Sequence, residues 1–88
     1  MALPLIFLAC GPGQMVSRGG HWRITFGQSA PNAHWAIAWH RPAPPLRMNL
    51  NIGDYTGATE AQVVALARQR CDTEREASAQ RFRMDFAN

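Results

Sequence analysis

Two neighbouring stretches, residues 21–27 and 34–40, constrain the fold of this 88-residue chain more than any other feature. Each stretch alternates bulky apolar residues with polar or small ones, and this period of two is typical of a strand with one buried face. The bulky members are Trp22, Ile24, Phe26, Trp35, Ile37 and Trp39. With residues 27–33 as a loop, the two stretches predict an antiparallel hairpin.

The register of this hairpin follows from the requirement that apolar residues share a face. The pairs expected on that basis are Phe26 with Trp35, Ile24 with Ile37 and Trp22 with Trp39. This register places all three tryptophans of the chain on the buried face and makes Trp35 a core residue. A base-stacking platform is the alternative interpretation of the tryptophans, but their spacing favours a core. The register also sets His21 opposite His40.

Two further strands and one helix complete the expected elements. Residues 3–9 are apolar on both faces, and residues 46–52 alternate again. The sequence Thr59-Glu60-Ala61-Gln62 has the pattern of a helix N-terminal capping box, and no glycine or proline interrupts the apolar stripe after it. We therefore expect a helix over residues 60–83.

These elements predict an α+β fold in one small domain, residues 1–88. It consists of a three- or four-stranded antiparallel sheet with one C-terminal helix packed on one face. Residues 1–10 end in Ala-Cys, but they lack the positively charged start of a secretory leader, so a strand is the expectation. We accordingly expect no membrane segment and a cytoplasmic protein whose two cysteines, Cys10 and Cys71, are reduced.

The charges divide unevenly along the chain. Residues 1–53 carry four arginines and no acid, a charge of +4, whereas residues 54–88 carry five arginines and six acids, a charge of −1. A cationic sheet region beside a mixed helix indicates an anionic partner, although a short chain also produces such asymmetry by chance. The expected binding residues are those assigned to the uncovered sheet face and its connector: Arg23, Arg41, Arg47, His21, His34, His40, Asn49 and Asn51.

Metal binding and catalysis find little support in the residue pattern. His21 and His40 could approach each other across the hairpin, but the sheet region offers no third ligand of the kind that zinc sites need. No phosphate-binding loop or paired catalytic carboxylates are recognisable, and Cys71 lies on the apolar stripe of the helix. We therefore expect no metal, no cofactor and no enzymatic activity.

The resulting hypothesis is a small interaction protein, either an accessory subunit or an inhibitor. It would dock its basic sheet face on an acidic surface of a larger protein or nucleoprotein. The alternative is a protein that binds nucleic acid directly through the same Arg and His residues, although four arginines are few for that purpose. The sequence leaves homodimer formation open.

Overall fold

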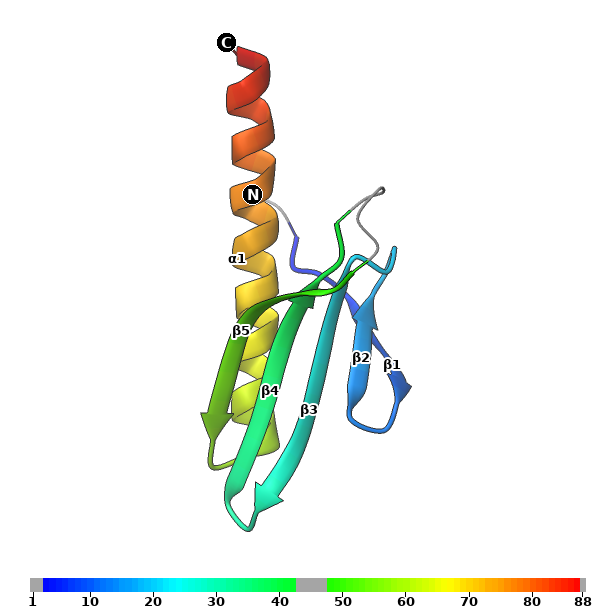
Figure 1. Cartoon of the computed structure of the whole chain (residues 1–88), viewed down its shortest axis with the longest axis vertical. Helices are drawn as coiled ribbons and strands as arrows, with labels where there is room; N and C mark the ends of the chain where they lie inside the picture. The colour runs from blue at the N-terminus through cyan, green and yellow to red at the C-terminus, as the bar shows by residue number, and fades with distance from the viewer. Residues whose placement is uncertain (1–2, 43–47, 88) are drawn as a thin grey trace.

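The computed structural model describes the backbone of residues 3–42 and 48–87, and the side chains of residues 3–42 and 48–80. Five strands form a single antiparallel sheet in chain order, and one long helix lies against one face of it (Figure 1). The elements are β1 Phe7–Gly11, β2 Gln14–Ser17, β3 Trp22–Ala30, β4 Ala33–His40, β5 Leu50–Gly57 and α1 Glu60–Ala87.

The α+β class, the antiparallel sheet and the single C-terminal helix are confirmed, but the sheet has five strands and not three or four. The additional strand is β2, in a segment whose glycines and polar residues indicate a connector. It forms because Pro12-Gly13 makes a tight turn back from β1, with Gly13 at φ 67°. Proline followed by a residue of positive φ is the signature of a type II turn.

The hairpin of β3 and β4 is longer than expected. Residues 27–33 are not a loop, because the strands continue to Ala30 and resume at Ala33, leaving Pro31-Asn32 as the turn. Asn32 has φ 62°, a conformation that asparagine tolerates better than most residues. Both hairpin turns thus consist of a proline followed by a residue of positive φ, which is Gly13 in one turn and Asn32 in the other.

The register of that hairpin is one residue away from the predicted one. The observed partners are Trp22 with His40, Ile24 with Ala38, Phe26 with Ala36 and Arg23 with Trp39. A shift of one residue turns every side chain of a strand to the opposite face. The prediction that the three tryptophans share a face is therefore wrong, as is the core role of Trp35. Trp22 faces α1, whereas Trp35 and Trp39 point away from it.

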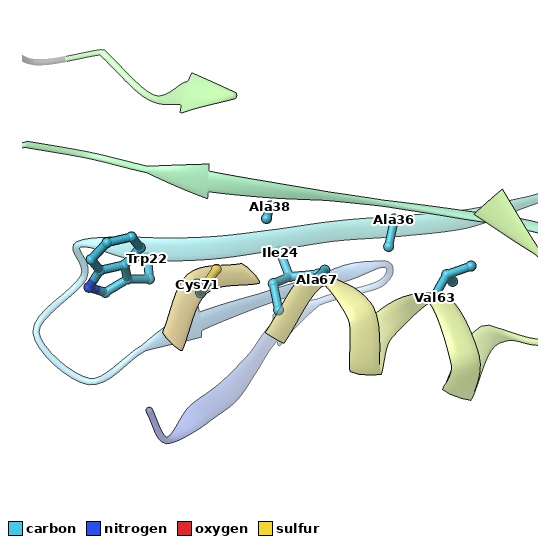
Figure 2. Packing of buried hydrophobic residues seen from close by; sticks show 7 residues of the cluster. All are labelled: Trp22, Ile24, Ala36, Ala38, Val63, Ala67 and Cys71. Atoms are coloured by element: carbon cyan, nitrogen blue, oxygen red, sulfur yellow. The ribbon is translucent and has the colours of Figure 1, made fainter. Parts of the chain in front are cut away.

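The core explains why this register is adopted. The helix contributes a stripe of small side chains, Val63, Ala67 and Cys71, and it packs on Ile24, Ala36 and Ala38, all fully buried (Figure 2). Trp22, only 7% exposed, closes one end of the cluster. Alanines on β4 let the helix approach the sheet closely, and tryptophans at those positions would hold the two layers apart. The small residues of β4, and not its large ones, face the helix.

The helix begins as predicted and runs without interruption. The Gln62 N–H donates to the Thr59 hydroxyl at 3.2 Å, and the Gln62 side-chain oxygen accepts the Ala58 N–H at 3.2 Å, which together cap its first turn. It continues past Cys71 to Ala87, beyond the predicted end at residue 83. Its C-terminal half extends past the end of the sheet (Figure 1).

The two outer strands are displaced from their predicted ranges. The strand expected over 46–52 is Leu50–Gly57, so it begins later and continues five residues beyond the predicted end. The strand expected over 3–9 begins at Phe7, and the residues before it are attached to the helix. The Leu5 N–H donates to the Asp72 carboxylate at 2.8 Å, and the Arg75 guanidinium donates to the Leu3 carbonyl.

Candidate functional site

The sheet surface that faces away from α1 is the candidate site, and we call it the open face. The strand pairings assign its members, because directly paired residues point to the same side of a sheet. They are Leu8, Gln14, Val16, Arg23, Thr25, Gly27, Trp35, Ile37, Trp39, Asn51, Asp54 and Thr56. No other described element of the chain packs on this face, since the contacts of α1 are with the side that holds Ile24, Ala36 and Ala38.

A row of three large apolar side chains runs along β4 in the middle of the open face. Trp35, Ile37 and Trp39, here called the aromatic row, are all partly exposed. The Trp35 indole fills the space over Gly27 on β3, where an added Cβ would lie 2.7 Å from the ring carbon Cζ2. The glycine at position 27 therefore lets the indole lie against the sheet. An aromatic ring covering a cross-strand glycine is a known way of protecting the strand at such a residue.

Hydrogen bonds hold the polar residues beside the aromatic row. The Trp39 indole Nε1–H donates to the Thr25 hydroxyl at 2.8 Å. On the β5 side, the Asn51 amide donates to the Asp54 carboxylate at 2.8 Å, and the Gly53 N–H donates to the Asn51 side-chain oxygen at 2.9 Å. These bonds restrict the rotamers of the groups that flank the row, so a partner would meet a surface that is largely organised in advance.

Arg23 supplies a positive charge on the β3 side of the row. Its Nη1 donates to the Gln14 side-chain oxygen at 2.9 Å and lies 3.9 Å from the Cys10 sulfur. Both ion pairs found among the described residues, Arg70–Glu74 and Arg75–Asp72, lie within α1. Arg23 is thus held by neutral groups and keeps its charge available to an anion, while Asp54 places a negative charge on the other side of the row.

The predicted binding residues divide between several places. Arg23 and Asn51 lie on the open face, whereas His34 and His40 pair with residues of the helix-facing side. The face assigned to these two histidines is therefore wrong, for the same reason as the register. Arg47 lies outside the described residues. Asn49 is exposed just before β5.

His21 and Arg41 lie together at the end of the sheet, beyond β3 and β4. The Arg41 N–H donates to the His21 carbonyl at 2.7 Å, and the His21 ring nitrogen Nδ1 lies 3.0 Å from the Arg41 carbonyl oxygen. Both residues are exposed. His21 is thus opposite Arg41 and not opposite His40, and the guanidinium of Arg41 extends the positive charge of the sheet region beyond the end of β4.

His40 is partly buried and packs on the helix-facing side of the sheet. Its ring stacks on Trp22, and desolvation by burial lowers its pKa, with the nearby Glu74 carboxylate acting in the opposite direction. No three of the His, Cys, Asp and Glu side chains within the described ranges gather as a metal site would require. The absence of a bound metal remains a prediction.

The two cysteines are free and differ in environment. Cys10 is exposed beside Arg23, while Cys71 is buried in the core under α1. Burial raises the pKa of the Cys71 thiol to about 12, with the Asp72 carboxylate acting in the same direction. A thiol in that state is not a nucleophile near neutral pH.

Hollows also lie along α1, away from the open face. One of about 500 Å³ follows α1 and is lined by Pro4, Asp72, Thr73, Arg75, Glu76, Ala77 and Gln80. Asp72 and Arg75 already bond the backbone of residues 3–5 there, so their polar atoms are engaged within the chain.

Comparisons of the chain with protein families, with curated proteins and with solved structures find no match. Within the described part of the chain, no helix combines the length and the apolar character needed to cross a membrane. The functional argument therefore rests on the open face itself. Sequence reasoning assigned Trp35, Ile37 and Trp39 to the core, and the signal that could have located them is the pair of alanines, Ala36 and Ala38, facing a helix stripe of small residues.

Proposed function

We propose that this protein is a small, non-enzymatic interaction protein that binds a larger protein through the open face. The observation that carries the proposal is the aromatic row, which lies uncovered in the middle of the sheet. Isolated apolar residues on a surface need no explanation, but a contiguous row with two indoles is typical of a binding site.

The surroundings of the row resemble the anatomy of a protein interface. Such interfaces have an apolar centre enriched in tryptophan and arginine, enclosed by a polar rim that excludes water. Here the rim consists of Arg23 and Thr25 on β3 and of Asn51, Asp54 and Thr56 on β5. The rim side chains are mostly bonded to one another or to the row, which lowers the entropy lost on binding.

The charge of this region favours an acidic partner surface on the β3 side. Arg23 has no carboxylate partner among the described ion pairs, and Arg41 is exposed beyond β4. Asp54 would face a donor or cation of the partner on the opposite side of the row. Complementary charges of this kind mainly speed association and select the partner.

The test uses variants that change the open face without touching the core. Ile37→Gln removes the centre of the row, and Arg23→Ala removes the adjacent charge. Matched controls are Leu66→Gln and Arg68→Ala on α1, where both side chains are exposed. Circular dichroism melts first establish that each variant folds.

The tagged variants are then used to capture a protein partner from the native host after nuclease treatment, and affinities are measured with the purified partner. We expect about tenfold or greater loss of affinity for each open-face variant, which corresponds to about 1.4 kcal/mol, and little change for the controls. Loss of binding in the α1 variants, with full binding by the open-face variants, would contradict the proposal.

Direct binding of single-stranded nucleic acid is the second candidate, and the placement of the indoles supports it. Trp35 and Trp39 lie on an open sheet beside Arg23, and aromatic side chains on sheets stack with unpaired bases. A labelled oligothymidylate titrated at two salt concentrations distinguishes the candidates. Binding that weakens steeply with salt and is lost in Ile37→Gln and Arg23→Ala would favour nucleic acid, whereas the protein-partner proposal expects no such binding.

A further inference from the structure

The outer edge of β1 is the second feature of this fold that can bind another chain. The sheet order places β1 at the end of the sheet, with β2 on one side and no described strand on the other. The unpaired N–H and C=O groups of an edge strand are a template for pairing with another strand. The pairing with β2 identifies which of these groups are free.

Hydrogen bonds in an antiparallel ladder join every second pair of residues. The Arg18 N–H donates to the Ile6 carbonyl at 3.1 Å, so Ile6 and Arg18 form such a pair. In the same register, Leu8 with Val16 is the next hydrogen-bonded pair. The backbone groups of the residues between them therefore point away from β2.

Three residues have backbone groups on this outer side: Leu5, Phe7 and Ala9. The Leu5 N–H is satisfied by the Asp72 carboxylate at 2.8 Å, as expected for a group that faces away from β2. The outward N–H and C=O groups of Phe7 and Ala9 have no hydrogen-bond partner among the described residues. The free part of the edge is thus short and sharply defined.

We propose that a second copy of this chain occupies the edge, with β1 pairing antiparallel to its counterpart about a twofold axis at Leu8. In this arrangement Phe7 of each copy exchanges two hydrogen bonds with Ala9 of the other, so all four free groups of each copy are satisfied. The edge is self-complementary because its two free residues lie symmetrically on either side of Leu8. The interface is therefore isologous, as in most homodimers.

The side chains of β1 fit the same arrangement. The sequence Phe-Leu-Ala-Cys-Gly has no charge and no proline, two features that commonly keep an edge strand from pairing. The register shift of β1 lies between Ala9 and Gly11, outside the Phe7–Ala9 segment that would pair. Leu8 is 54% exposed and lies on the open face. Across the axis the two Leu8 side chains would be cross-strand neighbours, with Cα atoms about 4.5 Å apart as in a non-hydrogen-bonded pair.

The dimer would form one continuous ten-stranded sheet, twice the five strands of one copy, with both helices on the same side. A twofold axis that makes edge strands antiparallel is perpendicular to the sheet, so both open faces also lie on one side. This inference goes beyond the proposed function and does not depend on it, since the β1 edge is separate from the aromatic row.

The test is site-specific disulfide formation. Leu8→Cys in a Cys10→Ser background places two thiols across the axis at a distance that a disulfide can span. We expect mild oxidation to give a covalent dimer on a non-reducing gel. The control, Gln14→Cys in the same background, carries an exposed thiol on β2 and should stay monomeric. The wild-type Cys10 should not cross-link to its copy, because it would lie opposite Ile6.

Sedimentation velocity gives an independent measurement on the unmodified protein. The wild type should sediment as a dimer, and Leu8→Lys should be monomeric because it sets two like charges side by side. Ala9→Pro should also be monomeric, since it removes an N–H that points away from β2, and circular dichroism would show that both variants fold. A monomeric wild type, a dimeric Leu8→Lys variant, or cross-linking through Cys10 in place of Leu8→Cys would overturn the proposal.

Discussion

Trp22 and His40 stack face to face, with ring centroids 4.0 Å apart and ring planes within 10° of parallel. They are directly opposite each other in the hairpin of β3 and β4, and they close the core at the end where α1 continues past the sheet. Burial lowers the pKa of His40, and the neighbouring His21 adds to that effect. The Glu74 carboxylate of α1 acts in the opposite direction but is the smaller effect.

This contact predicts that the protein loses stability as the pH falls below 6.5, the ordinary pKa of histidine. Burial in the folded state favours the neutral form of His40, so the unfolded state binds a proton at this residue more tightly. Acid therefore stabilises the unfolded state relative to the folded state. The stabilisation that comes from keeping His40 neutral is complete above pH 6.5. It is lost as the pH falls from 6.5 through the lowered pKa of His40 in the folded protein.

Urea melts on both sides of pH 6.5 measure this dependence. His40→Gln cannot titrate and should reduce the pH dependence of the unfolding free energy, whereas the control His34→Gln should retain it. Equal pH dependence in the wild type and in His40→Gln would show that another group is responsible.

The second prediction concerns the alanines of β4 under the helix. Ala38→Leu adds a large side chain where Ala67 and Cys71 pack closely, and it should cost about 1 to 3 kcal/mol of unfolding free energy. Ala30→Leu at the exposed end of β3 is the control and should cost much less. Chemical denaturation of the two variants checks this. Similar costs at the two positions would mean that position 38 does not face the helix.

The third prediction is a difference in reactivity between the two thiols. Cys10 is exposed, whereas Cys71 is buried and its pKa is raised to about 12. Alkylation by iodoacetamide at neutral pH should therefore modify Cys10 in the folded protein and reach Cys71 only in denaturant. Peptide mass spectrometry distinguishes the two sites. Rapid modification of Cys71 under native conditions would show that the core under α1 opens readily.

The hairpin shows how much of the fold could be predicted from the sequence. The alternation of residues 21–27 and 34–40 and the cap at Thr59 identified both strands and the helix, because those signals are local. Which side chains of β4 face the helix could not be predicted from the local sequence. It depends on the close approach of α1, which requires Ala36 and Ala38 beneath Val63 and Ala67. Hydrophobicity favours the large residues for the core, and only packing against this particular helix reverses that preference.

Because the side chains of β4 face the opposite way from the prediction, the candidate site also differs from the expected one. The uncovered sheet face was expected to be cationic, with the histidines beside Arg23. Arg23 lies there, but the centre of the face is the aromatic row and Asp54 adds an acid. The strand β2 was also missed, because Gln14–Ser17 is too short to show a period and forms only through the turn before it and its pairing with both neighbours.

The last prediction tests the contact that positions the aromatic row. In Gly27→Ala the new Cβ would lie 2.7 Å from the Trp35 ring, so the indole must move. The ring is the far end of a rotatable side chain, and displacing it should cost only about 0.5 to 1.5 kcal/mol. The protein should therefore stay folded while the environment of the indole changes.

The indole N–H resonance of Trp35 measures this change directly. The control is Thr56→Ala, which shortens the residue opposite Trp35 on β5. We expect a large shift in Gly27→Ala, a small one in Thr56→Ala, and weaker partner binding by the glycine variant. An unchanged Trp35 resonance in a folded Gly27→Ala protein would mean that the indole does not cover Gly27 in solution.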